Sequence, residues 1–583
     1  MPSPFRTELQ ARAVDPAGRR WIFVPYDQLT DQLGPLAREA PDDVGIVVVE
    51  SPAKGRERPY HRQKLALVLA NLRHFALEQA SRGVAVRHVV SPGDYAEALR
   101  IFLAEPPPEV RRGASGAPLR VMEPAERELR EDLAPLVREG VLDVLPHEGW
   151  LTTVEDFEEG AGRRPPWRMD AFYRRVRRRT GVLMAEGSPV GGKFSFDAEN
   201  REPWAGDPPA AVPPTFRADP VTAEVLDLVA QVFPDHPGKL VPEALPSTLA
   251  DAEALWAWAR EACLPHFGPH EDAMSTVSRT LFHTRISGVV NLHRLTPARV
   301  LKDALALEVP LAGKEGFVRQ ILGWREFVRH VHRATDGLRD LSGEAARGAD
   351  PGPGEGAPDG PGADGGNPDD RDPDGRDPDG GVPQRNGHAA PSFLGARHPL
   401  PPTFWGGAPS GLNCLDQVVE SVWEEGYSHH ITRLMILSNL GTLLDVDPRE
   451  LTDWFWAGYI DAYDWVVEPN VLGMGTFAVG ELMTTKPYVS GTPYIRKMSD
   501  YCDGCALDPD RTCPVSELYW AFLARHRERL KGNRRMALPL ASAARRSEAR
   551  RSADARVARE VQAALAAGEP VTADRVRAAR EEA

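Results

Sequence analysis

The sequence is poor in cysteine and contains no long apolar run. It has only five cysteines in 583 residues, an odd number and too few for the disulfide framework of a small secreted domain. No window approaches the roughly 18 uninterrupted apolar residues that a membrane span needs, and the N-terminus lacks a run of signal-peptide length. These absences predict a soluble, cytoplasmic protein that does not contact membranes, and we expect a monomer.

One long segment is almost without apolar residues other than alanine and proline. Residues 340–391 consist mainly of Gly, Pro, Asp and Ala, a composition that buries too little apolar surface to offset the entropy of ordering. Of these, residues 340–380 hold 12 acidic and 3 basic residues, so most of the formal net charge of −14 comes from this stretch. We therefore predict a disordered acidic insert, and the net charge says little about partners.

Two basic clusters depart from the acidic average. Residues 168–179 and 525–551 concentrate arginine near aromatic side chains. Such stretches can neutralise the phosphates of a nucleic acid, but solvated arginine-rich helix faces have the same composition. The sequence alone leaves both interpretations open. The Ala- and Arg-rich residues 552–583 predict a flexible, loosely helical tail.

The first 150 residues alternate between β-branched runs and helical patterns. Residues 20–29 and 43–51 are typical of strands, and residues 62–83 carry apolar side chains at helical spacing up to a stop at Gly83. This alternation predicts an α/β domain with a Rossmann-like parallel sheet over 1–150.

Ligands of such sheets lie beyond the carboxyl ends of the strands. Asp27, Gln28 and Glu50 follow predicted strands closely, and we take these three residues as candidate contacts for a small molecule.

From about residue 226 the pattern becomes helical. Long amphipathic stretches have apolar residues three and four positions apart, and β-branched runs are scarce. We predict an all-α domain over 226–339 and 392–551, joined to the first domain by a connector over 151–225. By pattern alone its tryptophans are core residues, namely Trp405, Trp423, Trp454, Trp456, Trp465 and Trp520.

Three of the five cysteines, Cys502, Cys505 and Cys513, lie within a dozen positions. Three thiolates and a remote fourth can hold zinc or a [4Fe–4S] cluster, since both take four thiolate ligands. We prefer Cys414 as the fourth ligand, because Cys263 lies inside an amphipathic helical pattern. The cysteines alone do not decide between the two metals.

Several long motifs resemble one known family. The segment "YCDGCALDPDRTCPVSELYW" at 501–520 and the segment "GVLMAEGSPVGGKFSFDAENREP" at 181–203 closely resemble the iron–sulfur bacterial cryptochromes and photolyases. Further segments match in family order, and the resemblance spans the chain except for the insert and the tail. These segments are 27–29, 73–79, 281–292, 319–329, 426–439 and 461–474.

The resemblance implies a light-driven DNA-repair flavoprotein, a photolyase that acts on UV-damaged DNA. It implies an N-terminal α/β domain for a 6,7-dimethyl-8-ribityllumazine antenna and a helical C-terminal domain that binds FAD. It also implies a [4Fe–4S] cluster in place of zinc, with ligands at positions that match Cys414, Cys502, Cys505 and Cys513.

The family's active-site histidines match His429 and His430. Repair of a (6–4) photoproduct needs a proton donor, and histidine suits that role because its pKa lies near the working pH. We expect His430 to be the donor with His429 in support, and (6–4) lesions to be the preferred substrate over cyclobutane dimers.

The resemblance also nominates residues for the flavin and for its reduction. Trp405 and Trp454 match an electron-transfer chain, and we expect Trp456 to compensate for Phe455, which stands where relatives can have tyrosine. Glu468 is the expected acid near the flavin, although the family's acid can match position 467, here a valine. The expected flavin contacts are His283, Ser287, Asn291, Gln320, Trp324, Arg325, Asp461, Asp464, Glu468 and Asn470.

Three positions depart from the family pattern. Tyr26 stands where the family usually has glycine, which puts a bulky side chain beside the expected antenna. Gly288 and His293 stand where relatives tend to have proline and glycine, so we expect the flavin pocket to differ in shape.

Two other functions remain as alternatives. One is a cryptochrome-like blue-light photoreceptor on the same scaffold, without repair activity. The other is a light-independent iron–sulfur DNA-binding protein, such as a primase-like module.

Overall fold

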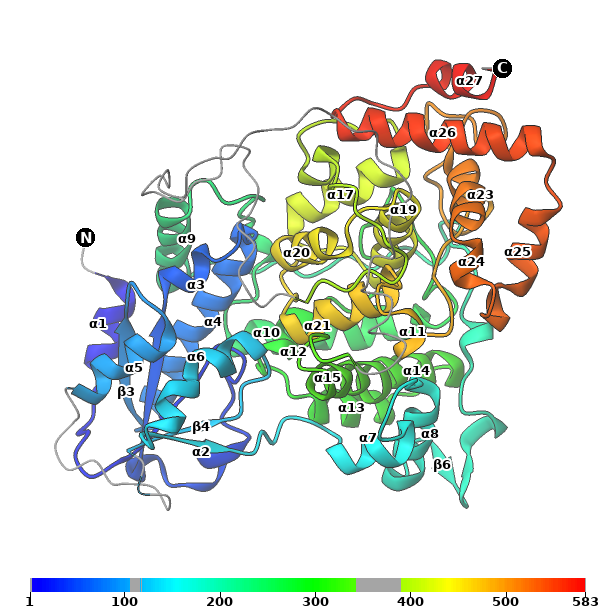
Figure 1. Ribbon diagram of the computed structural model, residues 1–583. Coiled ribbons are helices and arrows are strands. Elements are labelled where there is room, and N and C mark those ends of the chain that lie inside the picture. Colours follow the sequence, from blue (N-terminus) through cyan, green and yellow to red (C-terminus); the bar gives the residue numbers. More distant parts are fainter. Residues whose placement is uncertain (1–2, 105–115, 117, 342–388, 582–583) are drawn as a thin grey trace.

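The structure is a computed structural model that describes residues 3–104, 116, 118–341 and 389–581. Figure 1 shows an α/β part built mainly from the N-terminal quarter of the chain beside a larger part made of helices. Most of the predicted acidic insert at 340–391 lies outside the described residues. None of the described helices is long and apolar enough to cross a membrane.

The α/β half is built on one sheet of five parallel strands in the order β3-β2-β1-β4-β5. The central pair is in register with Ile22 opposite Ile46, and every residue of β2 is buried, as its β-branched composition predicts. The predicted parallel α/β fold is confirmed. The strands are β1 Arg20–Phe23, β2 Val44–Glu50, β3 Ala85–Val90, β4 Leu119–Met122 and β5 Leu142–Leu145.

Helices cover both faces of this sheet. The long helix α4 is buried over most of its length, because the sheet and the helical half pack against it from different sides. Its Lys64 Nζ donates to the backbone carbonyls of Trp456 and Ala462, at 3.1 and 2.5 Å, and so ties the two halves together. The helices of this half are α1 Pro4–Ala11, α2 Gly34–Arg38, α3 Pro52–Arg56, α4 Arg62–Ser81, α5 Tyr95–Ala104, α6 Arg127–Arg138 and, from later in the chain, α9 Pro220–Val232.

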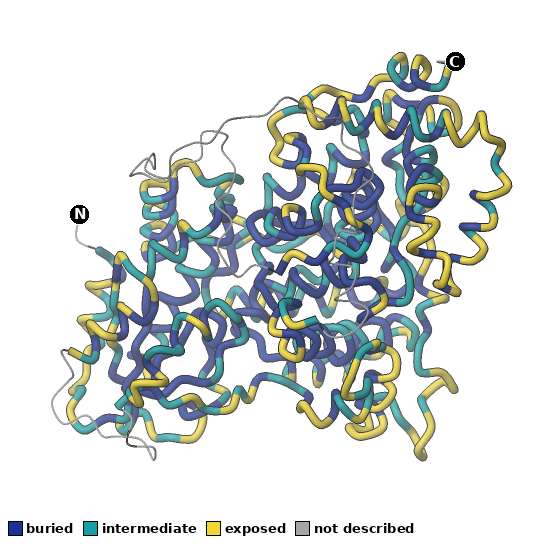
Figure 2. The backbone as a smooth tube through the Cα atoms, in the orientation of Figure 1, coloured by how far each residue is buried: buried dark blue, intermediate teal, exposed yellow. Residues whose placement is uncertain are grey.

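The second half is helical, as predicted, and Figure 2 shows its centre densely buried. The expected connector at 151–225 contributes α7 Val154–Ala161 and α8 Met169–Thr180. The remaining helices are α10 Leu249–Trp258, α11 Leu264–Phe267, α12 Ser287–Asn291, α13 Pro297–Ala306, α14 Leu311–Val318, α15 Glu326–Ala334, α17 Asn413–Glu425, α18 His430–Thr432, α19 Asn439–Leu443, α20 Pro448–Gly458, α21 Asp464–Val467, α22 Thr492–Met498, α23 Val515–Arg525, α24 Arg527–Leu530 and α25 Ala537–Ala544.

Several helices of this half contain wide π-helical turns. Three of these turns lie at Arg319–Arg325, Arg433–Ser438 and Glu468–Gly475. Wide turns of this kind displace side chains from the regular helical positions and are frequent at functional sites. All three contribute residues to one central cavity.

The structure corrects the prediction of a flexible tail at 552–583. The tail forms α26 Glu548–Ala566 and α27 Ala573–Glu581, and α26 lies across α23 at one end of the molecule (Figure 1). Val557, Val561 and Leu565 recur every four residues and are buried in the core of the helical half. The Ala- and Arg-rich composition of this segment makes the narrow apolar stripe difficult to recognise in the sequence.

The packing of α26 gives a stability prediction. Leu565→Ala should lower the free energy of unfolding by about 2–5 kcal/mol, because it leaves a cavity in a buried cluster. Urea unfolding followed by circular dichroism measures this change. The matched control is Leu538→Ala on α25, whose side chain is 82% exposed and should matter by less than about 0.5 kcal/mol. Equal effects of the two variants would mean that the tail is not packed.

Candidate functional site

The central cavity of the helical half encloses about 340 Å³. It lies where the three π-helical turns meet α12, α18 and the segment after α20. The structure brings together most of the residues nominated for flavin binding and catalysis. Those that line the cavity are His283, Ser287, Asn291, Gln320, Trp324, Arg325, His429, His430, Asp461 and Asn470.

A buried ion pair forms one wall of this cavity. Asp461 pairs with Arg433 at 2.9 and 3.1 Å and accepts a hydrogen bond from Ser287 Oγ at 2.6 Å. Asn291 donates to the backbone carbonyl of Asp461 at 2.9 Å. Burial raises the pKa of Asp461, but Arg433 and Ser287 outweigh it and hold the pKa below 3.8, so this carboxylate stays ionised.

Arg325 lines the cavity and has unsatisfied donors. Its guanidinium lies over the rings of Trp150 and Trp465, at 4.3 and 5.0 Å, and a carboxylate oxygen of Glu326 is 3.6 Å away. None of its three side-chain nitrogens has a hydrogen-bond partner among the residues that the structure describes. A buried arginine in this state is suited to bind an anionic group such as a phosphate.

Three histidines stack at one side of the cavity. The rings of His283 and His429 are parallel with centroids 4.2 Å apart, and the ring of His430 meets His283 edge-on at 5.2 Å. Burial and the neighbouring imidazoles lower the pKa of His283 and His429 well below 6.5, so both are neutral. His430 keeps an exposed edge, yet the protein crowded around it still lowers its pKa, which Asp272 opposes.

Two nominated carboxylates lie outside the cavity. Asp464 accepts from the backbone amides of Arg127 and Glu128, at 2.6 and 3.2 Å, and so joins the start of α6 to the helical half. Of the two positions that the sequence offered for the acid near the flavin, Val467 lines the cavity and Glu468 does not.

Glu468 is held elsewhere by two arginines and a histidine. It pairs with His332 at 2.9 Å, Arg449 at 3.0 Å and Arg339 at 3.1 Å. Burial raises its pKa, but these partners outweigh burial and bring the pKa to about 2. Glu468 is therefore an ionised structural residue turned away from the cavity.

A line of aromatic rings leads from the surface to the cavity. Trp405 is 38% exposed and stacks on Trp423 at 5.6 Å, which meets Trp454 edge-on at 5.8 Å. Trp454 contacts Phe455 at 5.2 Å, and Phe455 lines the cavity. The indole N–H groups of Trp423 and Trp454 both donate to the backbone carbonyl of Phe404, at 2.7 and 2.8 Å, which fixes their relative position.

The sequence did not assign Trp423 to an electron-transfer route, because its helical spacing is that of an ordinary core residue. Trp456, expected in this route, lies instead under the guanidinium of Arg58 at 3.6 Å and lines a different cavity. Tyr459 takes the place beside Phe455, with their rings stacked at 5.3 Å and an interplanar angle of 12°.

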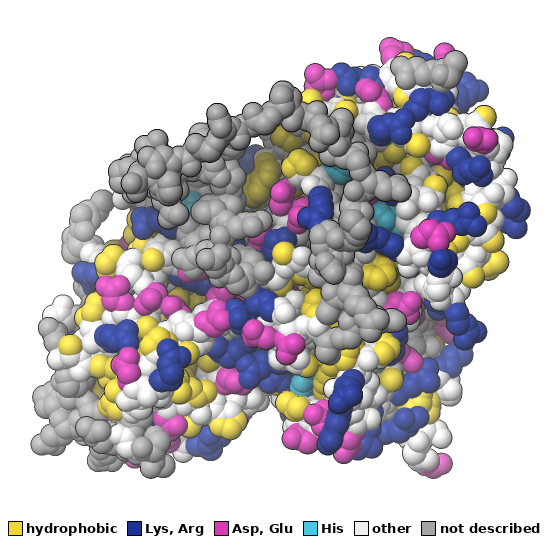
Figure 3. All heavy atoms as spheres, in the orientation of Figure 1, with side chains coloured by type: hydrophobic (Ala, Val, Ile, Leu, Met, Phe, Trp, Pro, Cys, Tyr) yellow, Lys and Arg dark blue, Asp and Glu magenta, His cyan; other side chains and the backbone are white. Residues whose placement is uncertain are grey.

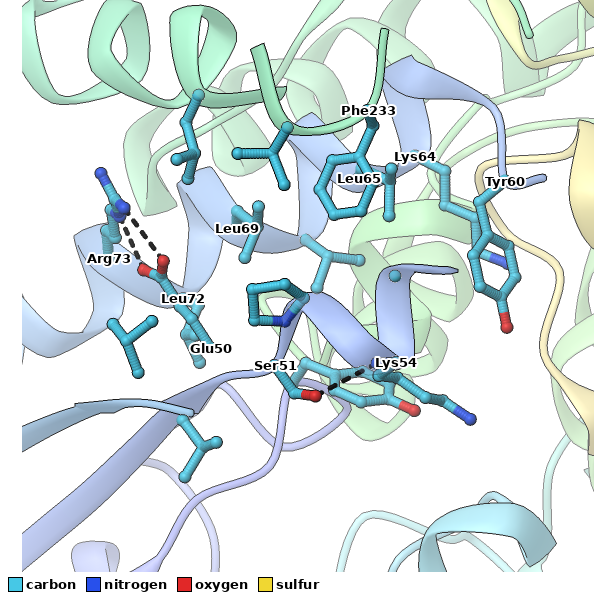
Figure 4. Close-up of a pocket in the computed structure, with 18 of the residues that line it drawn as sticks. Glu50, Ser51, Lys54, Tyr60, Lys64, Leu65, Leu69, Leu72, Arg73 and Phe233 are labelled. Atoms are coloured by element: carbon cyan, nitrogen blue, oxygen red, sulfur yellow. Dashed lines mark hydrogen bonds and ion pairs between the residues drawn. The ribbon is translucent and has the colours of Figure 1, made fainter. Parts of the chain in front are cut away.

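That second cavity, of about 320 Å³, lies between the sheet and the helical half. Figure 4 shows Glu50 paired with Arg73 at one side of it and Lys64 and Tyr60 at the other. Arg73 and His88 outweigh the effect of burial and lower the pKa of Glu50 to about 2.

Of the three candidate contacts after the strands, only Glu50 lines this second cavity. Gln28 donates to the Met122 carbonyl at 2.9 Å, and Asp27 accepts from the Ala125 amide at 3.0 Å. Tyr26 does line it, with its hydroxyl bonded to Glu126 and its ring stacked on Tyr463 at 6.1 Å.

The cysteines come together as the sequence predicts. A small cavity of about 20 Å³ is lined by Cys414, Cys502, Cys505 and Cys513, whereas Cys263 is buried elsewhere and contacts the His283 carbonyl. Within the described ranges, no group of three or more His, Cys, Asp or Glu side chains forms a site for a metal ion.

Comparison with known proteins identifies the family. Residues 22–244 match the family described as "Deoxyribodipyrimidine photo-lyase-related protein". A (6-4) photolyase of Agrobacterium fabrum is 34% identical to this chain over 541 residues, which cover 90% of the chain and 96% of that protein. This chain belongs to the photolyase family.

Two further proteins are similar to this chain. An uncharacterized protein of Acanthamoeba polyphaga mimivirus is 36% identical over 98 residues, 17% of this chain and 76% of that protein. A crystal structure of a bacterial class III photolyase from Agrobacterium tumefaciens covers 95% of this chain and 97% of its own, with a TM-score of 0.51 and 13% identity. This last similarity establishes the photolyase fold.

The departures from the photolyase pattern have local explanations. His293 takes a φ of +59°, a conformation that glycine adopts without strain, and its Nδ1 is 2.6 Å from the backbone carbonyl of Asp27. At Gly288 an added Cβ would lie 3.1 Å from the Leu67 side chain. Both positions lie where the segment nominated for flavin binding packs against the α/β half.

The two basic clusters differ in the structure. On α8, Arg174, Arg175 and Arg179 pair with acidic neighbours, and Arg177 is fully buried and bonded to backbone carbonyls. The 525–551 cluster is largely exposed, and Figure 3 shows Lys and Arg side chains gathered over these C-terminal helices. Both clusters therefore offer exposed basic side chains, and ion pairs with acidic neighbours partly neutralise the one on α8.

Proposed function

We propose that this protein is a light-driven DNA photolyase that reverses pyrimidine photoproducts, with the (6–4) lesion as its substrate. The observation that carries the proposal is its similarity to a (6-4) photolyase over 96% of that protein's length. The central cavity supports it, since it combines unsatisfied cationic donors with a group of histidines at its side.

The residues of the central cavity fit FAD. Arg325 would bind the diphosphate, because its buried donors lack hydrogen-bond partners. The Asp461–Arg433 pair offers fixed polar groups, and Trp324 and Val467 supply apolar wall. When bound, reduced FAD excited by light supplies one electron to the lesion and takes it back after the bonds rearrange.

The remaining steps belong to the protein's own side chains. A photolesion must leave the duplex to reach a buried cofactor, and damaged bases flip at low cost because their stacking is impaired. The exposed basic cluster at 525–551 would hold the phosphates. His430, with an exposed edge at the cavity, would donate a proton from its imidazolium to the lesion, and neutral His429 would keep the site uncharged behind it.

The aromatic line supports a route for electrons from the surface to the flavin. Its members would be Trp405, Trp423 and Trp454, ending at Phe455 and Tyr459 beside the cavity. Phe455 has no proton to lose after oxidation, whereas Tyr459 has a hydroxyl 2.8 Å from Ser428 Oγ. Tyr459 is therefore our candidate for the role that the sequence assigned to Trp456.

The four clustered cysteines fit a [4Fe–4S] cluster. A single zinc ion draws four sulfurs to about 2.3 Å, whereas a cubane cluster keeps them farther apart. The four cysteines line one cavity, and the resemblance of the 501–520 segment to iron–sulfur photolyases is the reason to prefer the cluster.

We also propose the second cavity as the place of a lumazine antenna, with Glu50 and Tyr26 in its wall.

Repair is the first test of this function. The reduced holoprotein, under blue light, should remove a (6–4) photoproduct from an oligonucleotide and should do nothing in darkness, as followed by chromatography. His430→Ala should slow repair by about 10²- to 10⁴-fold while flavin content stays unchanged. The matched control is His266→Ala, an exposed histidine that does not line the cavity.

The outcomes separate the alternatives. A protein that keeps its flavin and photoreduces, but repairs neither a (6–4) lesion nor a cyclobutane dimer, is a photoreceptor. A protein purified without flavin, and unable to take it up, is a light-independent DNA-binding protein.

The pH dependence of repair tests the role of His430. Since the pKa of His430 is lowered, less of this histidine is protonated at neutral pH, and repair should accelerate as the pH falls.

Arg325 gives a test of the flavin site. Arg325→Met should weaken FAD binding by roughly 10- to 100-fold, because it removes charge-assisted hydrogen bonds worth about 1.5–3 kcal/mol. Titration of the apoprotein with FAD measures the change. Arg329→Met is the control, since Arg329 also lies over Trp150 but does not line the cavity. Equal affinities of the Arg325 variant and the wild type would refute the assignment.

Trp423 gives a test of the electron route. Trp423→Phe should remove most of the photoreduction of bound FAD, because Trp405 and Trp454 are joined through this ring. The reduction is followed by flavin absorbance under illumination at a wavelength that the flavin absorbs. Trp456→Phe should photoreduce like the wild type. A loss in the Trp456 variant instead would restore the prediction made from the sequence.

A further inference from the structure

The C-terminal segment 571–580 contacts both parts of the cysteine set. The backbone amide of Val571 donates to the carbonyl of Ser410 at 2.8 Å, just before the helix that carries Cys414. Nine residues later, Arg580 donates to the carbonyl of Arg511, which lies in the loop between Cys505 and Cys513. One short segment therefore spans ligands that are far apart in the sequence.

The first contact depends on a glycine. Gly411 has a φ of +78°, and a Cβ at this position would lie 2.9 Å from the amide nitrogen of Val571 and closer still to its carbonyl oxygen. Only glycine permits this approach of two backbones. The adjacent Leu412 lines the cysteine cavity, so the contact lies directly behind the ligand set.

The second contact is a charged one. Arg580 also pairs with Glu517 on α23, the helix that begins after Cys513. The Arg580 side chain is 27% exposed and that of Glu517 is 18% exposed, so the pair is partly shielded from solvent. Arg580 therefore joins the cysteine loop to the helix that follows it.

The segment is itself fixed to the body of the protein. Val571, Val576 and Ala579 are buried in the same apolar cluster as Cys414. Arg556 on α26 donates to the carbonyls of Ala579 and Arg580, at 2.9 and 3.1 Å. These contacts hold the end of the chain in a defined position over the cysteines.

We propose that the segment 571–580 is a clamp that retains the iron–sulfur cluster. It ties the Cys414 segment to the Cys502–Cys513 loop, so that the fourth ligand cannot move away from the other three. Residues behind the ligands of a metal site commonly control how tightly it is held. The inference rests on the proposed [4Fe–4S] cluster and adds a retention role for residues outside the ligand set.

The test measures loss of iron from the purified holoprotein. Iron and acid-labile sulfide per chain are determined after timed incubation with EDTA and desalting. Arg580→Ala should lose both about tenfold faster than the wild type, Arg580→Lys should restore part of the retention, and Arg577→Ala should match the wild type. Arg577 is on the same helix and pairs only with Asp574 among the described residues.

Two further variants disrupt the clamp by means other than a substitution of Arg580. Deletion of residues 569–583 leaves α26 in place, and Gly411→Ala displaces Val571, so both should release iron faster than the wild type. FAD content and melting temperature are measured in parallel, and in Arg580→Ala both should stay close to those of the wild type, which separates retention of the cluster from general destabilisation. The deletion also removes the buried Val571 and Val576 and should lower the melting temperature as well.

The outcomes are distinguishable. Iron loss at the wild-type rate in Arg580→Ala and in the deletion overturns the clamp. Parallel loss of iron, FAD and melting temperature in Arg580→Ala also overturns it, because Arg580 would then be a general packing residue. A wild-type protein that carries no iron at all overturns both the cluster and the clamp, and leaves the repair assay as an independent test of the photolyase function.

Discussion

The buried ion pair between Asp461 and Arg433 is the interaction on which the site depends. Taking both charges out of water costs several kcal/mol per ion, which their attraction offsets only when the remaining polar atoms are also bonded. In this protein the remaining polar atoms are bonded, since Ser287 donates to Asp461 and Arg433 Nε donates to the carbonyl of Ser428 at 2.8 Å. Arg433 also lies 4.0 Å over the ring of Tyr459. This one ion pair thus fixes Ser287 at the start of α12, Ser428 beside His429, and Tyr459 at the inner end of the aromatic line.

The sequence predicted the features of the fold and of the site that follow from local residue patterns. The strands at 20–23 and 44–50 are β-branched and buried, and residues 62–81 have helical spacing, so their types follow from composition. Three cysteines were nominated as metal ligands because their close spacing has few other uses, and Cys414 because Cys263 lies in a helical pattern and because of the family resemblance. Most nominated cavity residues also lie together, since their segments match a family whose fold this chain shares.

The other features of the site could not be predicted from the sequence, because they depend on the direction in which neighbouring side chains point. Val467 and Glu468 are adjacent, but the π-helical turn that begins at Glu468 sends one toward the cavity and the other toward His332. Spacing rules for a regular helix do not describe such a turn. Trp423 likewise has the pattern of a core residue, and only the fold brings it between Trp405 and Trp454.

The position of Glu468 also connects the two described stretches that flank residues 342–388. Arg339, near the end of the first stretch, pairs with Glu468. Arg449 pairs with the same carboxylate and donates to the carbonyl of Ala389, the first residue of the second stretch, at 3.3 Å. Glu468 and Arg449 thus hold described residues on both sides of these positions. Because Val467, the residue next to Glu468, lines the central cavity, the same short segment contributes to both the cavity wall and this ion-pair cluster.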